Sequence, residues 1–443
     1  MPYIPHTEAD VAEMLAVIGV SSIDDLFCEI PANLQLQPGS LDIPKALDEP
    51  KLYAHLLEIA SKNVDLSKVT CFLGAGIYDR YIPASVGAVI SRGEFLTAYT
   101  PYQPEASQGY LQAIYEFQTM VAELYGCDIA NASMYDGATS MAEAAIMSTS
   151  LNKRQKVVVS AGVHPHYRQV LDTYCWSMDI EVQTAPSTKG VTVPFVDDKE
   201  AACYIVQYPN FFGSIEDLAA VREACDKNGS TMIVVTDPVA CALLKPPGHF
   251  GADIVVGEGQ PMGVPMGLGG PGVGLFACKK ELIRFIPGRI VGKTKEVHGD
   301  KPGYVMTLRT REQDIRREKA TSNICTNEAL MALANTVYMI ALGKNGMRSV
   351  AESSVRNAQY MISELEKIGI GAMTNKVFCE FVVGLPKDAE WVCSAMLSKG
   401  ILAGLPLGKY YDGPPNTLLI CTTELRTKDQ IDTYVSALKE VLA

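Results

Sequence analysis

Five short apolar runs, rich in β-branched residues and separated by longer segments, constrain the fold of this chain most strongly. They cover residues 156–160, 203–207, 232–236, 252–256 and 273–277. Helical patterns occur over residues 105–125, 138–151 and 215–227. Continuous apolar runs of this length are typical of strands that are buried on both faces of a mostly parallel sheet. The sequence therefore predicts a layered α/β domain.

Two further regions flank this pattern. Residues 1–65 predict an N-terminal helical arm, in which a segment rich in Pro and Leu between Pro31 and Pro50 would cover another surface, such as that of a neighbouring subunit. Residues 66–340 form the predicted large α/β domain, and residues 341–443 a smaller α+β domain. The second boundary follows a long helix near residues 327–342. Strands at 377–383 and 417–421 and helices at 390–398 and 428–442 make up the small domain.

Composition excludes several classes of function. The net charge of −12 argues against nucleic acid or an anionic membrane surface as the main partner. The chain has no run of eighteen apolar residues and no signal-peptide pattern at its start, so we expect neither a membrane span nor secretion. The closest pair among the 12 cysteines is Cys379 and Cys393, and there is no CxxC motif. We therefore expect reduced, mostly buried thiols and a cytoplasmic location.

One candidate site opens the predicted helix at 138–151. Free backbone N–H groups at Gly137, with the hydroxyls of Thr139 and Ser140, are the groups that seat a phosphate at a helix N-terminus. Asp136 favours another interpretation, a capped helix without ligand, because its charge would repel phosphate.

Polar residues also follow two of the predicted strands. His164, in a His-Pro-His segment, comes soon after strand 156–160 and could stack on a flat ring or act in acid–base chemistry. An ordinary hydrogen-bonded loop histidine is an equal alternative. Asp237 ends strand 232–236, where a carboxylate could pair with a protonated ring nitrogen or could cap a turn. The histidines are otherwise scattered, so we expect no metal site.

The Gly-rich segment from Gly257 to Gly274 contains a GxGxxG match at Gly267, Gly269 and Gly272. A dinucleotide-binding motif would follow a strand directly and open a helix. This one follows a long loop and leads into the predicted strand at 273–277, which excludes that interpretation.

A phosphate seat, a stacking histidine, a strand-end aspartate and a Gly-rich connection occur in the same order in pyridoxal-phosphate enzymes of fold type I. Those enzymes carry a lysine shortly after the strand that follows the aspartate, and this lysine forms the Schiff base. Here no lysine occurs between Pro246 and Cys278. The scaffold is predicted to be present without its cofactor anchor.

Longer stretches resemble a known family, the P-proteins of the glycine cleavage system, and within it the subunit 1 chains of the two-subunit members. The resemblance spans the chain. It is most specific at residues 72–78, 99–109, 135–139, 257–260 and 310–326. It implies an aspartate aminotransferase-like large domain of fold type I, followed by a smaller α+β domain.

The resemblance also implies a division of labour. Aligned on the glycine run from Leu268 to Gly272, the family's Schiff-base lysine falls at Gln260, which cannot form an imine. Gly137, Thr139, His164 and Asp237 are then relics of a cofactor site. Subunit 2 would hold pyridoxal phosphate, and the pair, arranged as an α2β2 heterotetramer, would decarboxylate glycine and transfer the aminomethyl group to the lipoylated H-protein.

The aromatic loop that contains Tyr99, Tyr102, Gln103 and Glu105 is the candidate to reach the shared active site, unless it only packs against the partner. Two other hypotheses remain open. The chain could be an autonomous pyridoxal enzyme that uses Lys245, Lys279 or Lys293, or a non-catalytic scaffold or regulatory partner.

Overall fold

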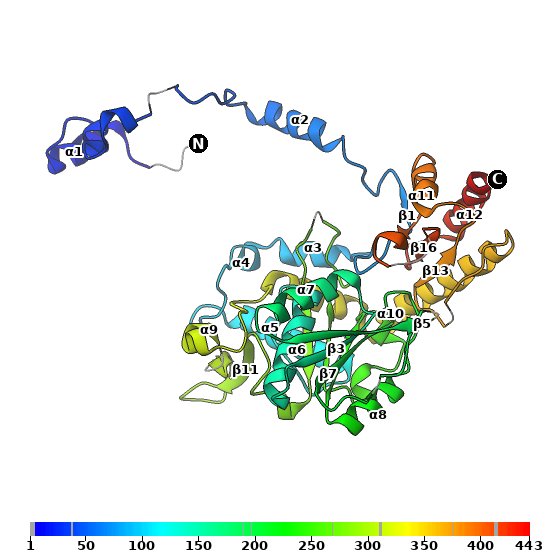
Figure 1. Cartoon of the computed structure of the whole chain (residues 1–443). Helices are drawn as coiled ribbons and strands as arrows, with labels where there is room; N and C mark the ends of the chain where they lie inside the picture. Colours follow the sequence, from blue (N-terminus) through cyan, green and yellow to red (C-terminus); the bar gives the residue numbers. More distant parts are fainter. Residues whose placement is uncertain are drawn as a thin grey trace. The chain divides into compact units, whose positions relative to one another are not determined.

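The structure is a computed structural model of the chain and describes residues 5–36, 39–188, 190–195, 197–267, 269–309, 312–374, 376–411 and 415–443. Leu268 of the glycine run, and Thr310 and Arg311 of the stretch that resembles the P-proteins, lie outside these residues. The chain divides into two compact units, Met1–Val64 and Asp65–Ala443 (Figure 1).

The N-terminal unit contains α1 (Glu8–Ile18), η1 (Asp24–Phe27), η2 (Ala32–Leu34) and α2 (Glu49–Ala60). Thr7 caps α1 in a reciprocal capping box with Asp10. No residue of these four elements is buried among the described residues. Large apolar side chains stand in solvent, such as Val17 at 83% exposure. That the arm covers another surface stays a prediction.

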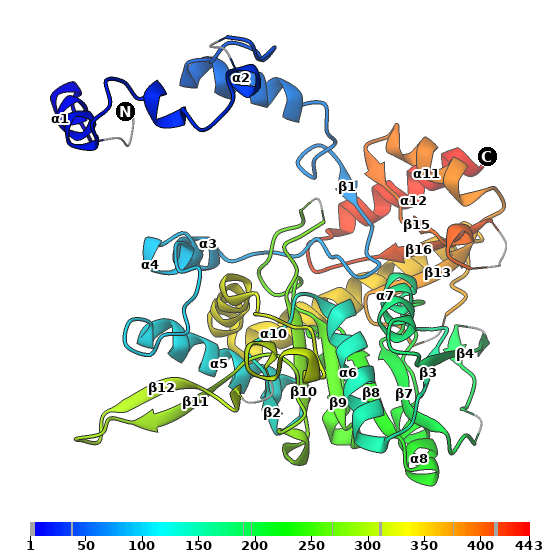
Figure 2. The same cartoon turned by 60° about the vertical axis from the view of Figure 1, so that its left-hand side comes forward.

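The second unit is built on a seven-stranded sheet in the order β2-β10-β9-β8-β7-β3-β4. The strands β3, β4, β7, β8 and β9 run parallel to their neighbours in this group, whereas β10 is antiparallel to both β9 and β2 (Figure 2). The bounds are β2 Ile129–Ala130, β3 Lys156–Ser160, β4 Glu181–Ala185, β7 Ala201–Tyr208, β8 Thr231–Thr236, β9 Ile254–Glu258 and β10 Gly274–Cys278. The predicted mostly parallel sheet is confirmed.

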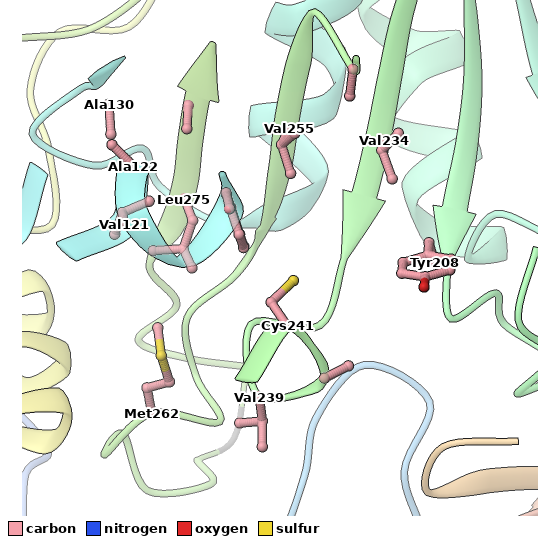
Figure 3. Packing of buried hydrophobic residues seen from close by; sticks show 14 of the residues in the cluster. Val121, Ala122, Ala130, Tyr208, Val234, Val239, Cys241, Val255, Met262 and Leu275 are labelled. Atoms are coloured by element: carbon pink, nitrogen blue, oxygen red, sulfur yellow. The ribbon is translucent and has the colours of Figure 1, made fainter. Parts of the chain in front are cut away.

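Both faces of this sheet are buried, as the continuous apolar runs predicted. Along β7, Tyr204 and Val206 belong to one core cluster, and Cys203 and Ile205 belong to another. The first cluster includes residues of α5 (Gln108–Tyr125) and α8 (Leu218–Asn228), and Figure 3 shows part of it. The second includes residues of α6 (Gly137–Asn152) and α7 (Pro165–Trp176). Alternate residues of one strand therefore pack into opposite layers.

The C-terminal part has its own three-stranded sheet, β13-β16-β15 (Glu380–Gly384, Thr417–Cys421 and Leu405–Pro406). Its core includes residues of α11 (Ala389–Leu397), α12 (Lys428–Leu442) and the end of α10 (Ala329–Glu366). The sequence predicted only the first part of α10. The helix is interrupted at Gly343, whose φ is 59°, and continues to Glu366. The domain boundary at 340/341 stays a prediction.

Smaller elements connect these layers. Their bounds are β1 Thr70–Cys71, α3 Ala84–Ile90, α4 Gly93–Leu96, β5 Ser187–Thr188, β6 Val191–Thr192, η3 Ala240–Ala242, η4 Pro247–Phe250, η5 Lys280–Leu282, β11 Ile290–Lys295, β12 Pro302–Thr307, α9 Gln313–Arg316, η7 Arg317–Lys319, β14 Ile401–Leu402 and η8 Leu407–Lys409. Strand β1 pairs in parallel with β14 and so joins the start of the second unit to the C-terminal part. None of the helices in the described part of the chain has the length and apolar character needed to cross a bilayer.

A carboxyl group lies inside this fold on α6. Glu143 is 2% exposed. Burial raises the pKa of its carboxyl group to about 7, although hydrogen bonds with the side chain of Ser322 and the backbone of Asn323 oppose the rise. The folded chain thus holds a proton on Glu143 at pH values between 4.5 and 7, where the unfolded chain has lost it.

This extra proton makes the contribution of Glu143 to stability largest below pH 4.5 and smaller as the pH rises towards 7. We expect Glu143→Gln, which has no proton to lose, to remove roughly 3 kcal/mol of the pH dependence of the unfolding free energy between pH 5 and pH 8. Urea titrations across this range measure it. Glu123→Gln, at an exposed position on α5, is the control. Equal pH dependence in both variants would contradict the assignment.

Candidate functional site

The carboxyl ends of the parallel strands meet at one edge of the sheet, where ligand crevices of α/β proteins lie. Asp237 follows β8, Glu258 ends β9, and His164 follows β3. These three residues line one cavity together with Tyr78 and Glu380. The structure therefore brings together the strand-end histidine and aspartate that the sequence singled out. The cavity measures only about 40 Å³, which is room for a few water molecules.

The predicted phosphate seat at the start of α6 is occupied by carboxylates of the chain itself. The N–H of Gly137 donates to Oε2 of Glu258 (3.0 Å). The N–H of Thr139 donates to Oδ1 of Asp136 (2.8 Å), and the Thr139 hydroxyl bonds back to the Asp136 backbone to complete a capping box. The capped-helix alternative is the one that the contacts support.

Glu258 is held in this position by two more backbone groups. Its Oε1 accepts from the N–H of Gln260 (3.0 Å) and from the N–H of Val273 (2.9 Å). Burial raises the pKa of Glu258 to about 7, against the three backbone N–H groups, which lower it. The carboxylate thus takes up three donors at the place where a ligand anion would need them.

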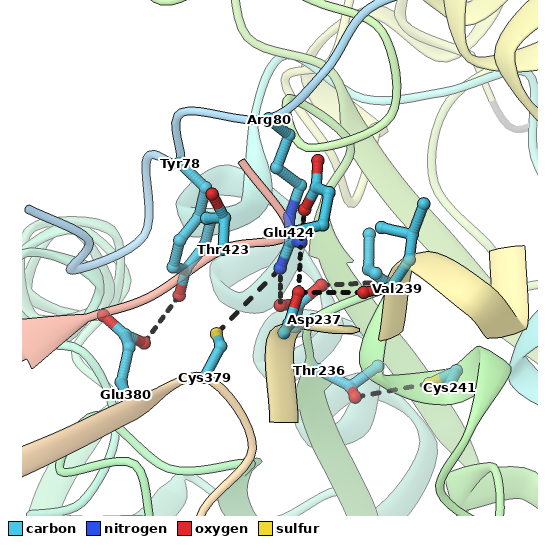
Figure 4. A network of polar contacts seen from close by, with 12 residues as sticks. Tyr78, Arg80, Thr236, Asp237, Val239, Cys241, Cys379, Glu380, Thr423 and Glu424 are labelled. Atoms are coloured by element: carbon cyan, nitrogen blue, oxygen red, sulfur yellow. Dashed lines mark hydrogen bonds and ion pairs between the residues drawn. The ribbon is translucent and has the colours of Figure 1, made fainter. Parts of the chain in front are cut away.

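Asp237 faces a guanidinium group. Nη2 of Arg80 lies 3.6 Å from Oδ2 of Asp237, while Nη1 of Arg80 lies 2.7 Å from Oε2 of Glu424 (Figure 4). The Arg80 side chain is 2% exposed. Burial raises the pKa of Asp237, and Arg80 opposes that rise. The carboxylate that could pair with a ring nitrogen therefore faces a cation of the chain itself, although its Oδ2 has no hydrogen-bond partner among the described residues.

Gln260 occupies the position predicted for the missing lysine, and its amide forms three hydrogen bonds. Its Nε2 donates to the carbonyl oxygens of Tyr78 (3.1 Å) and Val264 (2.9 Å), and its Oε1 accepts from the N–H of Tyr78 (2.9 Å). A lysine could not accept that last bond, because its ammonium group has no acceptor. Gln260 therefore joins the segment around Tyr78 to the loop after β9.

His164 is used structurally as well. Its Nδ1 accepts from the N–H of His166 (3.1 Å), and its Nε2 lies 2.8 Å from the carbonyl oxygen of Ala75. Burial lowers the pKa of His164 to about 4, so the ring is neutral near pH 7 and Nε2 is the donor. The ring lies against Phe211 and Tyr167, with centroids 4.8 Å and 5.0 Å away. The hydrogen-bonded loop histidine is the alternative that this geometry supports.

Glu380 completes the closure of the crevice. Its carboxylate accepts from the N–H of Ala75 (2.6 Å) and from the hydroxyl of Tyr78 (2.8 Å). Burial raises the pKa of Glu380 to about 7. Arg80, Glu258 and Glu380 are the residues of this site that sequence analysis missed. Of these, only Glu258 had a local signal, because it lies two residues before Gln260.

The aromatic loop is a separate cluster. The hydroxyl of Tyr102 lies 2.5 Å from Oγ1 of Thr326 and 2.6 Å from Oδ1 of Asn327, and the Arg289 guanidinium lies 4.0 Å from its ring centroid. Tyr99 is 94% exposed, and Gln103 and Glu105 are exposed too. Arg289 and Asn327 were not singled out in the sequence analysis, whereas Thr326 ends the stretch 310–326 that resembles the P-proteins. Among the described residues, no group of three or more His, Cys, Asp or Glu side chains could hold a metal ion.

Comparison with solved structures defines the class. The chain aligns with a glutamate decarboxylase of Lactobacillus brevis (TM-score 0.65, 14% identity, 93% of this chain and 96% of the other). It also aligns with an alanine–glyoxylate aminotransferase of Nostoc sp. (TM-score 0.58, 16% identity, 96% and 100%). At these identities the likeness concerns the fold alone. The chain has the α/β fold of pyridoxal-phosphate enzymes of fold type I, as the sequence predicted.

Closer relatives define the family. The family model described as "Glycine cleavage system P-protein" matches residues 1–438 of this chain. A protein of Geobacillus sp. named probable glycine dehydrogenase (decarboxylating) subunit 1 is 52% identical over 441 residues, 98% of each chain. The crystal structure of a glycine decarboxylase (P-protein) of the glycine cleavage system, in inhibitor-bound form, covers all of both chains with a TM-score of 0.92 and 44% identity. This chain belongs to the glycine cleavage system P-protein family.

The residues present do not fit the pyridoxal phosphate that this fold class implies. Glu258 accepts from the N–H of Gly137 at the start of α6, Arg80 lies against Asp237, and the sequence has no lysine between Pro246 and Cys278. No lysine is among the described residues that line the cavity. The crevice lies at the carboxyl ends of the strands, where ligands bind in this class of fold, but it offers no lysine and little free volume to a cofactor.

We expect Arg80→Met to lower the unfolding free energy by about 3–5 kcal/mol, because Asp237 and Glu424 would lose the cation they share inside the protein. Urea unfolding of the isolated chain measures it. Arg348→Met is the control, since its pair with Glu352 is exposed and should change stability by about 1 kcal/mol or less. Comparable losses of unfolding free energy in both variants would show that the buried ion pair contributes no more to stability than an exposed one.

Proposed function

We propose that this chain is the half of a two-subunit glycine dehydrogenase (decarboxylating) that does not hold the cofactor. The observation that carries the proposal is the crevice at the strand ends, which the chain fills with Arg80, Glu258 and Gln260. A partner of the same family, subunit 2, holds pyridoxal phosphate. The two chains work as a cytoplasmic α2β2 heterotetramer, and the names of the relatives, which specify a subunit 1, support the need for a second chain.

In the proposed reaction, glycine loses its carboxylate as CO2. The aminomethyl group that remains is transferred to one sulfur of the lipoyl disulfide of the H-protein, and the other sulfur becomes a thiol. Pyridoxal phosphate on the partner supplies the electron sink for the carbon from which CO2 leaves. The share of this chain is to complete the walls of that site and to position substrate within it.

The contacts of the Tyr102 hydroxyl and of the Tyr102 ring support the proposal that the loop around this residue reaches the shared active site. Tyr102 is anchored through its hydroxyl and its ring, so the exposed side chains of Gln103 and Glu105 beside it are presented from a fixed point. Arg289, which lies against the Tyr102 ring, also lines an open hollow of about 520 Å³. That hollow is lined mainly by charged and polar side chains, among them Glu312, Asp314 and Arg317, which could bind a polar substrate.

The alternative of an autonomous pyridoxal enzyme finds little support in the three lysines that it would use. The Nζ of Lys245 lies 4.2 Å from the ring centroid of Phe250, and the Nζ of Lys279 lies 2.5 Å from Oδ1 of Asp253. Lys293 lies in the hairpin of β11 and β12. None of them lines the crevice cavity. The alternative of a non-catalytic scaffold agrees equally well with a filled crevice. Only the activity of the two-subunit enzyme with altered residues in this chain distinguishes it from an active-site role.

We expect the double variant Tyr102→Phe, Glu105→Gln to lower the turnover of the mixed two-subunit enzyme about tenfold or more, because the loop would lose groups that position substrate. Release of CO2 from labelled glycine, in the presence of partner and H-protein, measures it. Light scattering should show an unchanged assembly. Tyr360→Phe with Glu366→Gln, on α10, is the control. Wild-type turnover in the loop variant would favour the scaffold alternative.

A further inference from the structure

We propose that two carboxylates, Asp136 and Glu258, exclude the cofactor's phosphate from this chain, so that restoring the lysine at position 260 is not enough to restore binding. The inference rests on the proposed function, which assigns the cofactor to the partner. It goes further, because it names the residues that keep the cofactor away from this half.

The first argument is the occupancy of donors. A phosphate at a helix N-terminus is bound by free N–H groups of the first turn and of the loops around it. At the start of α6 the N–H of Gly137 is bonded to Glu258 and that of Thr139 to Asp136. Glu258 also takes the N–H groups of Gln260 and Val273. Four donors in the seat are thus already used by the side chains of the chain.

The second argument is the charge in front of the seat. A hollow of about 270 Å³ opens there, lined by Asp136, His166, Glu258 and the glycines from Gly269 to Gly272, among others. Neither lysine nor arginine is among the described residues that line it. A phosphate monoester carries a charge of about −1.5 to −2 at pH 7. It would approach carboxylates without a compensating cation, in a place where the helix dipole is already offset by Asp136.

The third argument is that occupancy does not depend on the charge state of Glu258. A protonated carboxyl group keeps oxygen atoms that accept hydrogen bonds. The N–H groups of Gly137, Gln260 and Val273 therefore remain used whether or not Glu258 carries a proton. Loss of the lysine removes the covalent bond to the cofactor, whereas these carboxylates remove the non-covalent seat that has to form first.

The test uses five forms of the full chain, without partner. They are wild type, Gln260→Lys, the double variant Asp136→Ser/Glu258→Ala, the triple variant that combines all three substitutions, and Glu380→Gln as a control. Serine at position 136 retains an N-cap for α6 while it removes the charge. Glu380 is the matched control, because it is a buried carboxyl group with a comparably raised pKa. Its oxygens accept from Ala75 and Tyr78, which lie outside α6.

The first readout is the melting temperature of each form against the concentration of inorganic phosphate, with chloride held at matched ionic strength. We expect the double variant to bind phosphate with a dissociation constant at least about tenfold below that of the wild type, as a few recovered charge-assisted hydrogen bonds would give. Wild type, Gln260→Lys and Glu380→Gln should show no specific shift. A folded double variant without a phosphate response would overturn the proposal.

The second readout is the absorbance of Gln260→Lys mixed with pyridoxal phosphate. We expect no Schiff-base band from this variant, and a band once Asp136→Ser and Glu258→Ala are added to it. Stoichiometric uptake by Gln260→Lys alone would overturn the proposal. If Glu258→Ala does not fold, Asp136→Ser/Glu258→Leu, which fills a similar volume without an acceptor oxygen, replaces it in both readouts. Neither readout involves the partner or glycine. A negative result in them would therefore overturn this inference and leave the proposed function untouched. Failure of the proposed function would appear instead in the turnover of the mixed two-subunit enzyme.

Discussion

The segment from Ala75 to Arg80 is fastened across the carboxyl ends of the central strands, and the filled crevice depends on this attachment. Gln260 bonds both backbone groups of Tyr78, Glu380 accepts from Ala75 and Tyr78, and Arg80 reaches Asp237. Each buried polar group left without its partner would cost about 1–3 kcal/mol. The contacts are therefore interdependent, because opening the segment would expose several of these groups at once.

The same contacts engage, with side chains of this chain, the polar groups that a cofactor would bind. Where a ligand phosphate would sit, Glu258 satisfies the helix amides. Where a ring nitrogen would sit, Arg80 balances Asp237. At the lysine position, the amide of Gln260 bonds to neighbouring backbone. Most buried polar groups in folded proteins are paired, because an unpaired one costs free energy, so internal contacts of this kind stabilise a crevice that holds no ligand.

Sequence reasoning reached the architecture because it rests on local patterns. The apolar run at 156–160 and the amphipathic segment at 428–442 became β3 and α12 with the predicted bounds. The absence of a lysine was visible in a short interval of the sequence, and the resemblance to the P-proteins, aligned on the glycine run, pointed to Gln260 as its counterpart. Arg80 could not be found in this way, since Glu424 is 344 positions away and only the folded sheet brings them together. Glu258 was within reach, because alternate residues at the end of a strand share a face.

The central claim is that this chain holds no cofactor and its partner does. It is tested most directly by borohydride reduction in the presence of pyridoxal phosphate, followed by mass spectrometry, on this chain alone and beside subunit 2. The account predicts a stoichiometric adduct on the partner only, and glycine decarboxylation only when both chains are mixed. A stoichiometric adduct at any lysine of this chain would contradict it.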